Sequence, residues 1–248
     1  MIYAAICTLS VEACSWTRTF RRCAKPRLDR RRSRVGWASK SLLPCSWTPS
    51  GQTGIRSLAG LLNGAPSSVS DVVSSMQFAG LVDDQRRPAL PELFWELADR
   101  WQPLDADMQA FPSPGGGAVD DALKLGFDDV ETTSGSALTD PVAVATYGAP
   151  ESVRSDHPRD FYVPDQATLR RAVHLLGAAP DRPGRAATVR VAPVPMICSR
   201  RADATAWAKE EWPLAHPLFV ALDLAQDPGR GREVLDAWTP REPWHRVW

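Results

Sequence analysis

The chain has 248 residues, of which 44% are hydrophobic and 23% charged, and its formal net charge is zero. This composition is typical of a globular protein with one large domain or two small ones. It contains no run of about 18 uncharged apolar residues, so no membrane-spanning helix is predicted. The apolar start of the sequence lacks a basic n-region and a small-residue cleavage site, and we therefore expect a cytoplasmic protein.

Positive charge and cysteine are both concentrated in the first fifth of the chain. Residues 1–50 contain 10 Lys or Arg and 2 Asp or Glu, whereas residues 51–248 contain 19 and 27. The same stretch holds four of the five cysteines, but their spacing is not that of a zinc site, so no metal or other cofactor is predicted. Residues 1–53 show no periodicity. We interpret them either as a disordered basic arm that lies along phosphates, or as a segment read in a shifted frame.

Helical periodicity begins after Gly54 and predicts two helices joined by a turn. The first apolar face consists of Leu58, Ala59, Leu61 and Leu62. Asn63-Gly64 is a turn dipeptide, and Pro66 suits the first position of a second helix. The core face of that helix consists of Val69, Val72, Val73 and Met76, and Gly80 is expected to end it.

The outward face of the second predicted helix carries small polar side chains, namely Ser67, Ser68, Ser70, Asp71 and Ser74. Hydroxyl groups can bind phosphates or base edges, and a carboxylate can accept a hydrogen bond from a cytosine amino group. Two helices with a glycine-containing turn form the helix-turn-helix pattern, in which the second helix enters the major groove. We therefore interpret residues 54–101 as a winged helix-turn-helix domain that binds double-stranded DNA.

The segment LVDDQRRPAL predicts the wing, with a turn at Asp83-Asp84-Gln85 and with Arg86 and Arg87 near its tip. Pro91 is expected to open a third helix, whose apolar stripe of Leu93, Phe94, Leu97 and Trp101 would close the winged domain. No Lys or Arg occurs between Ser57 and Gln85. Attraction to phosphates would therefore come from Arg56, Arg86, Arg87, Arg100 and the basic arm.

Residues 102–136 are rich in Pro, Gly and Asp and are predicted to be a linker. Strand and helix patterns then interleave over residues 137–248, which predicts an α/β domain. It comprises a helix after Asp140, a strand at 160–163, an Asp165-capped helix at 166–176, a strand at 187–194 and a last helix opened by Asp227-Pro228. The apolar segment HPLFVALDLA is predicted to be buried, but its type is left open. The predicted fold class is α+β: an N-terminal winged helix-turn-helix followed by a C-terminal α/β domain.

The C-terminal domain offers one suggestive polar set, which consists of Asp223, Arg230, Arg232 and Glu233. Three interpretations stay open: a buried ion-pair network, a partner-binding patch, or an acidic nuclease-like site. No nucleophile elbow, P-loop or dinucleotide fingerprint occurs, so an enzyme is not the leading expectation. Five tryptophans occur in the last part of the chain, at 207, 212, 238, 244 and 248, and are expected mainly to pack the core.

The segments LPELFWELADRW, DFYVPD, ATVRVAPVP and WPLAHPLFVALDLAQDPGRGREVLDAW resemble winged-helix transcriptional regulators of actinobacterial type. These in turn are similar to antitoxins of the abortive-infection AbiE system. The resemblance covers about residues 55–248. It implies an operator-binding N-terminal domain and a C-terminal domain that counters or senses a protein partner, in the antitoxins a nucleotidyltransferase-like toxin.

These observations favour a transcriptional regulator, expected to be a repressor that binds DNA as a homodimer, because two-fold operators mirror two-fold proteins. One alternative is a protein-interaction module with a degenerate winged helix. The other alternative is a metal-dependent nuclease built on Asp223 and Glu233.

Overall fold

The computed structural model describes residues 54–248 except 62–63, 112–122, 140, 152–156 and 209. Contacts divide the chain after Leu93 into two compact units. We call residues 54–93 unit 1 and residues 94–248 unit 2, and each is described by itself. The protein is a mixed α+β protein, as the sequence predicted. The basic arm proposed for residues 1–53 lies outside the described residues.

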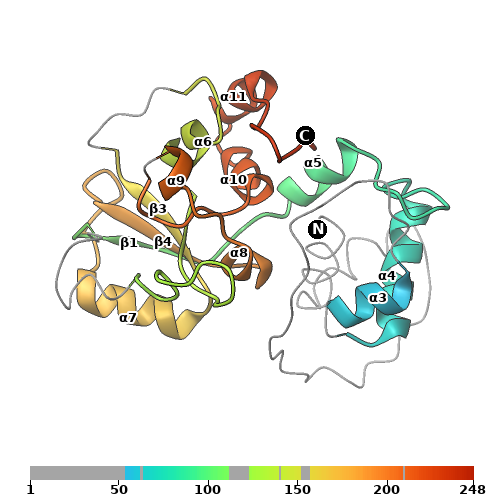
Figure 1. The fold of residues 1–248 in the computed structure, drawn as a ribbon, viewed down its shortest axis with the longest axis horizontal. Helices are drawn as coiled ribbons and strands as arrows, with labels where there is room; N and C mark the ends of the chain where they lie inside the picture. Colours follow the sequence, from blue (N-terminus) through green and yellow to red (C-terminus); the bar gives the residue numbers. More distant parts are fainter. Residues whose placement is uncertain (1–53, 62–63, 112–122, 140, 152–156, 209) are drawn as a thin grey trace. The chain divides into compact units, whose positions relative to one another are not determined.

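Unit 1 contains helix α3 (Ile55–Leu61), helix α4 (Pro66–Phe78) and the first two residues of α5 (Glu92–Ala98) (Figure 1). Pro66 occupies the start of α4, where its missing N–H group leaves no hydrogen bond unmade. The buried side of α4 consists of Val69, Val73 and Met76, so its predicted core face is confirmed apart from the half-buried Val72. These side chains share the core of the unit with Leu58, Ala59, Val82 and Leu93.

A short hairpin follows α4. Gly80 has a φ of 71°, a left-handed conformation that ends the helix at little cost for glycine. The Ala89 N–H donates to the Leu81 carbonyl at 2.9 Å, and the Asp83 N–H donates to the Arg87 carbonyl at 2.9 Å. The pairing of the predicted wing consists of a single antiparallel bridge between Val82 and Pro88.

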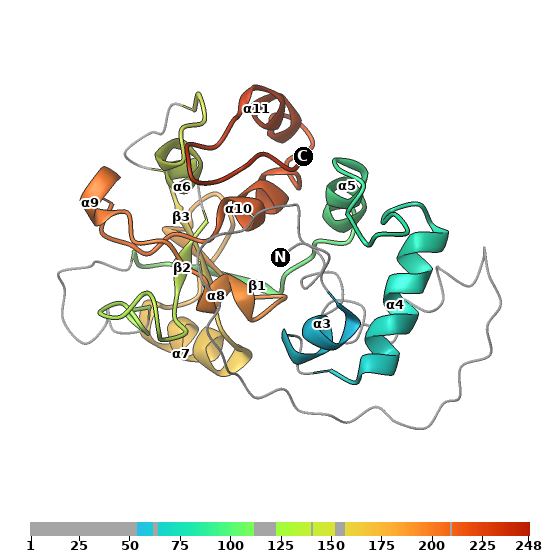
Figure 2. The same cartoon turned by 45° about the vertical axis from the view of Figure 1, so that its right-hand side comes forward.

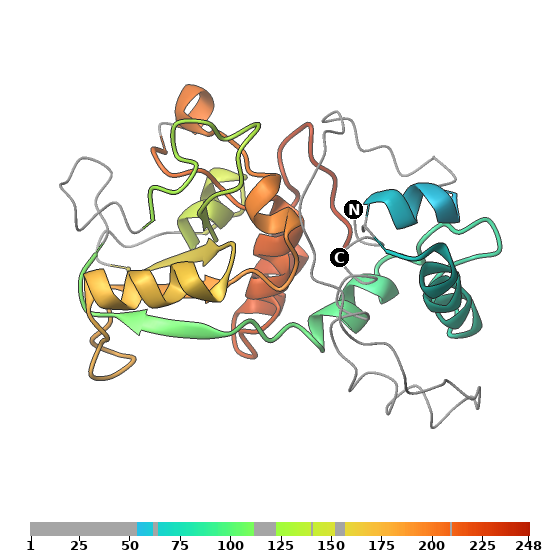
Figure 3. The ribbon, with the colours of Figure 1, turned by 90° about the horizontal axis from the view of Figure 1, so that it is seen from below.

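Unit 2 is built on a four-stranded mixed sheet of β1 (Asp105–Met108), β2 (Ala137–Leu138), β3 (Arg159–Val163) and β4 (Ala187–Val191). The strand order is β1-β4-β3-β2, with β3 and β4 parallel and the two outer pairs antiparallel. Strand β1 is green in Figure 3 and comes from the stretch predicted to be a linker. The sequence DADM does not have the composition of a strand, and β1 forms because its alternate aspartates face polar side chains of β4.

Helix α7 (Gln166–Leu176) connects β3 to β4 and packs against one face of the sheet through Leu169, Ala172 and Leu176. Asp165 caps this helix as predicted, because its carboxylate accepts a hydrogen bond of 2.8 Å from the Thr168 N–H. Helices α6 (Pro141–Thr146) and α10 (Pro217–Leu224) lie on the other side of the sheet (Figure 2). Helix α11 (Gly231–Ala237) packs on α10, and the short helices α8 (Met196–Ser199) and α9 (Thr205–Ala208) lie between β4 and α10 in the sequence.

The apolar segment HPLFVALDLA, for which the sequence did not decide between helix and strand, forms helix α10. Six of its eight residues are buried. An element that is apolar on all sides has no periodicity from which its type could be inferred. The last helix, α11, begins at Gly231 instead of at the predicted Asp227-Pro228 pair, because the Asp227 carboxylate forms a turn by accepting from the N–H groups of Gly229 and Arg230.

The tryptophans of unit 2 are mostly part of its core. Trp212, Trp238 and Trp248 are buried, while Trp207 and Trp244 are half-buried. Trp101 was expected to close the winged domain, but it belongs to unit 2, where it is fully buried and stacks on Phe219.

Within the part of the chain that the structure describes, no helix combines the length and the apolar character needed to cross a bilayer.

Candidate functional site

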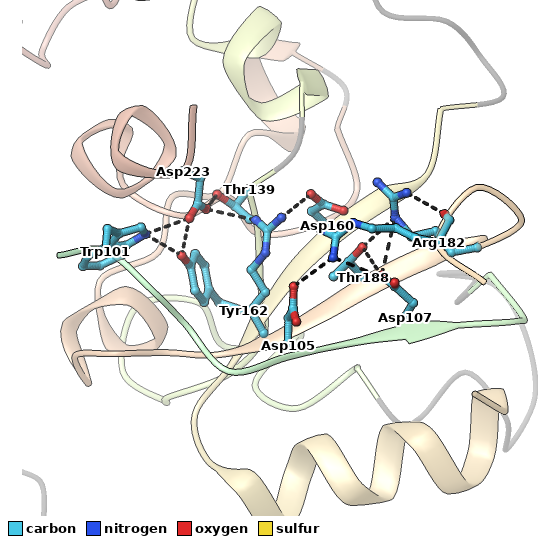
Figure 4. Close-up of polar contacts among 11 residues, drawn as sticks. Trp101, Asp105, Asp107, Thr139, Asp160, Tyr162, Arg182, Thr188 and Asp223 are labelled. Carbon is cyan, nitrogen blue, oxygen red and sulfur yellow. Dashed lines mark hydrogen bonds and ion pairs between the residues drawn. The ribbon is translucent and has the colours of Figure 1, made fainter. Parts of the chain in front are cut away.

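One face of the unit 2 sheet is polar. The register pairs Arg190 of β4 with Asp105 of β1 and with Tyr162 of β3, and it pairs Thr188 with Asp107 and Asp160. Because paired residues of neighbouring strands point to the same side, all six side chains lie on one face. They form two groups along this face, one under α10 and one toward the start of β4 (Figure 4).

Asp223 of α10 is the centre of the first group. One of its carboxylate oxygens accepts hydrogen bonds from the Trp101 indole N–H at 2.8 Å and from the Tyr162 hydroxyl. The other oxygen accepts a hydrogen bond from the Thr139 hydroxyl and lies 3.4 Å from Nη1 of Arg190. The side chain of Asp223 is only 8% exposed, so these protein donors replace the water that the carboxylate has lost.

Arg190 joins Asp223 to the sheet. Its Nη2 lies 2.8 Å from a carboxylate oxygen of Asp160, and the side chains of both residues are 15% exposed. One guanidinium therefore contacts two carboxylates. A planar guanidinium suits this position because its five N–H groups can serve several acceptors at once.

The electrostatics of the group follow from its burial. Burial raises the pKa of Asp223 above its ordinary value, against the opposing effects of Arg190 and of the three hydrogen-bond donors. Burial also raises the pKa of Tyr162, and the neighbouring Asp223 charge raises it further. Burial would lower the pKa of Arg190, but Asp223 and Asp160 outweigh this effect and raise it. Arg190 and Tyr162 are therefore protonated donors at neutral pH.

The second group lies nearer to solvent. The Thr188 hydroxyl donates to Asp107 at 3.0 Å and accepts from Nε of Arg185 at 2.9 Å. Arg182 lies 3.5 Å from the Asp105 carboxylate and 4.0 Å from that of Asp107. Since the side chains of Arg182 and Asp105 are 57% and 38% exposed, water screens this pair, and it adds little stability.

The four residues singled out in the C-terminal domain have different environments. Asp223 belongs to the buried group, whereas Arg230, Arg232 and Glu233 are exposed. Arg230 forms an ion pair of 3.0 Å with Glu151, and Arg232 lies 4.4 Å from the ring centre of Trp95. Among the described residues, no group of three or more His, Cys, Asp or Glu side chains is arranged to hold a metal ion. Of the four residues, only Asp223 takes part in a buried ion-pair network. Arg230, Arg232 and Glu233 lie on the surface of unit 2.

Sequence reasoning selected Asp223 but missed the residues that contact it. Thr139, Tyr162 and Trp101 lie 84, 61 and 122 residues away from it in the chain. A signal was present in β3, where Asp160 and Tyr162 alternate with Phe161 and Val163. Such alternation predicts that one face of the strand carries polar groups.

The predicted DNA-binding residues of unit 1 are mostly exposed. The exposed residues are Arg56, Ser67, Ser68, Asp71, Ser74 and Arg87, while Ser70 and Arg86 are half-buried. Arg86 has a φ of 61°, and its N–H donates to the Asp83 carbonyl at 2.8 Å, which closes the hairpin turn. Arg87 forms an ion pair of 2.7 Å with Asp83, and the hydrogen bond from the Arg87 N–H lowers the pKa of that carboxyl group.

The charge of unit 1 does not by itself favour a polyanion. Its cationic residues are Arg56, Arg86 and Arg87. Its acidic residues are Asp71, Asp83, Asp84 and Glu92, so residues 54–93 contain one more acidic than basic side chain. The positive charge needed to bind phosphates would have to include residues outside this range.

Comparisons with known proteins identify no relative. No protein-family model matches the chain, and neither a search of curated proteins nor a search of solved structures gives a match.

Proposed function

We propose that the protein is a DNA-binding transcriptional regulator whose unit 1 is a winged helix-turn-helix. The observation that carries this proposal is the division of α4 into two faces. Val69, Val73 and Met76 are buried, whereas Ser67, Ser68, Asp71 and Ser74 are exposed. A helix with small polar side chains on its exposed face can approach the major groove closely: the serine hydroxyls can donate to phosphates or base edges, and the Asp71 carboxylate can accept from a base amino group.

The hairpin after α4 supports the same proposal. Its turn carries Arg86 and Arg87, and the proposal takes this hairpin as the wing. Cations at a wing tip can contact the DNA backbone or the minor groove beside the helix in the major groove. Residues 1–50, with 10 Lys or Arg against 2 Asp or Glu, would supply the rest of the phosphate attraction.

Unit 2 would then be the partner or sensor domain. Its exposed Arg230, Arg232 and Glu233 offer charged groups to a protein partner, such as the toxin of an antitoxin-like operon. Binding as a homodimer to a two-fold operator completes the proposal.

A second candidate function is a protein-interaction module that does not bind DNA. The excess of acidic over basic side chains in residues 54–93 favours it, because an acidic surface repels phosphates. The two functions differ in one measurable quantity, which is the salt dependence of DNA binding.

The experiment is a fluorescence-anisotropy titration of the full chain with the DNA upstream of its own gene, over a series of salt concentrations. The proposal expects saturable binding that weakens steeply as salt rises. Replacing both Arg86 and Arg87 with alanine should weaken binding and reduce the slope of log K against log salt by about 1–2.

The matched control replaces Arg170 and Arg171 of α7, two exposed arginines of unit 2, with alanine. This double variant removes the same charge and should bind as the wild type does. Absence of binding at low salt, or an equal loss in both double variants, would reject the winged-helix proposal and leave the interaction module. Cleavage of the DNA in the presence of Mg²⁺ or Mn²⁺ would instead favour the nuclease.

A further inference from the structure

Unit 2 contains a cavity of about 420 Å³ that opens beside α6 and α9. Its apolar wall is formed by Val142 and Ala145 of α6 and by Trp207 and Ala208 of α9, and its charged residues are Glu151 and Arg241. The volume lies in the range of about 300–1,000 Å³ that small-molecule sites have, but this hollow is wide open to solvent, and Trp207 is its one aromatic residue among those described.

The aromatic wall is held in place by contacts behind it. Tyr147 is fully buried, and its ring packs edge-on against Trp244 with 4.8 Å between the ring centres. Both rings contact Trp207, and the Trp207 indole N–H donates to the Asp203 carbonyl at 2.9 Å. The Arg241 N–H donates to the Tyr147 carbonyl at 3.0 Å, which fixes the backbone of the arginine beside the cavity. A ligand would therefore meet a surface that is already formed.

The two charged residues of the cavity are not equivalent. Glu151 forms an ion pair of 3.0 Å with Arg230, which compensates its negative charge. Arg241 lies over the Trp207 ring, 5.0 Å from its centre. Among the residues that the structure describes, no carboxylate lies within ion-pair distance of Arg241. Of the two charged side chains described at the cavity, Arg241 is thus the one without an ionic partner among the described residues, and its guanidinium lies next to the indole ring.

We propose that this cavity binds a small organic anion with a flat apolar body. The body would lie against Trp207 and the aliphatic side chains of α6, and the anionic group would accept hydrogen bonds from the Arg241 guanidinium. The proposal concerns unit 2 alone and does not depend on DNA binding.

The test uses the full chain without DNA and ligand-observed saturation-transfer NMR. The probes are indole-3-acetate and its neutral analogue indole-3-acetamide, which has the same shape and no charge. We expect saturable binding of the carboxylate and at least about fivefold weaker binding of the amide. In Arg241→Gln the carboxylate should bind no better than the amide, whereas Arg170→Gln, on α7, should behave as the wild type does.

Ala145→Phe should weaken both probes, because the added ring fills the cavity. Far-UV circular dichroism establishes that each variant is folded, and the exposed Arg241 can be replaced without disturbing the core. The proposal is overturned by the absence of saturable binding up to about 5 mM probe, by equal affinity for carboxylate and amide, or by unchanged affinity in Arg241→Gln.

Discussion

Replacing Asp223 with alanine removes the acceptor at the centre of the buried polar group. The variant leaves the Thr139 hydroxyl without this acceptor, and it leaves Arg190 with Asp160 as its remaining carboxylate. The Trp101 indole N–H keeps the Tyr162 oxygen, at 3.1 Å. Because Arg190 keeps Asp160, the main cost is that of buried donors left without an acceptor, which is about 1–3 kcal/mol. We expect the unfolding free energy of unit 2 to fall by that amount.

The assay is urea-induced unfolding followed by tryptophan fluorescence. Seven of the ten tryptophans belong to unit 2 and none lies in residues 54–93, so the signal reports mainly on unit 2. Asp236→Ala is the matched control, because Asp236 is an exposed acidic residue of α11. The control should change the unfolding free energy by less than about 0.5 kcal/mol.

A small effect would refute this reasoning. If Asp223→Ala costs less than about 1 kcal/mol, the carboxylate does not compensate the buried donors around it. If Asp236→Ala costs as much as Asp223→Ala, the loss reflects the change in net charge and not the buried contacts.

Three further predictions concern local features of unit 2. Burial lowers the pKa of His216 from 6.5 to about 4. The stability that neutral His216 contributes is therefore present above pH 6.5 and is lost as the pH falls toward 4. Between neutral pH and about pH 5, the unfolding free energy of the wild type should fall by about 1–2 kcal/mol more than that of His216→Asn, a variant that keeps a capping acceptor. Urea unfolding at both pH values measures this difference. Gly231→Ala places a Cβ atom 1.9 Å from the Leu224 carbonyl oxygen and should lower the thermal midpoint clearly, whereas Gly229→Ala meets only an ordinary contact of 3.5 Å and should not; equal midpoints would contradict this. Asp165→Ala removes the cap of α7 and should cost about 1 kcal/mol in urea unfolding, a prediction that an unchanged midpoint would exclude.

The elements that the sequence predicted well have local causes. Helices α4 and α7 combine an apolar periodicity with a start signal within a few residues, namely Pro66 and Asp165. Strand β1 has neither, and it depends on pairing with β4, about 80 residues later in the chain. Periodicity and capping are properties of neighbouring residues, whereas pairing of this kind is decided by the whole fold.

The sequence likewise predicted only part of the candidate site, namely Asp223 without the residues that contact it. Asp223 was singled out as one of a polar set with Arg230, Arg232 and Glu233, for which a buried ion-pair network was one of three interpretations. Its neighbours in the sequence, Arg230 and Arg232, were the natural candidates, but the partner is Arg190, from the middle of the sheet. Single-sequence patterns indicate that a buried charge is compensated without indicating which distant residue compensates it.

The wide spacing of the Asp223 contacts has a consequence for synthesis of the chain. Trp101, Thr139, Tyr162 and Arg190 all leave the ribosome before Asp223, and the earliest precedes it by 122 residues. Unit 1, in contrast, is held by contacts between helices that follow one another directly. Contacts between distant residues form slowly, since a long loop must close first. We therefore expect the nascent chain to fold unit 1 early and to keep the polar face of unit 2 hydrated until α10 has emerged.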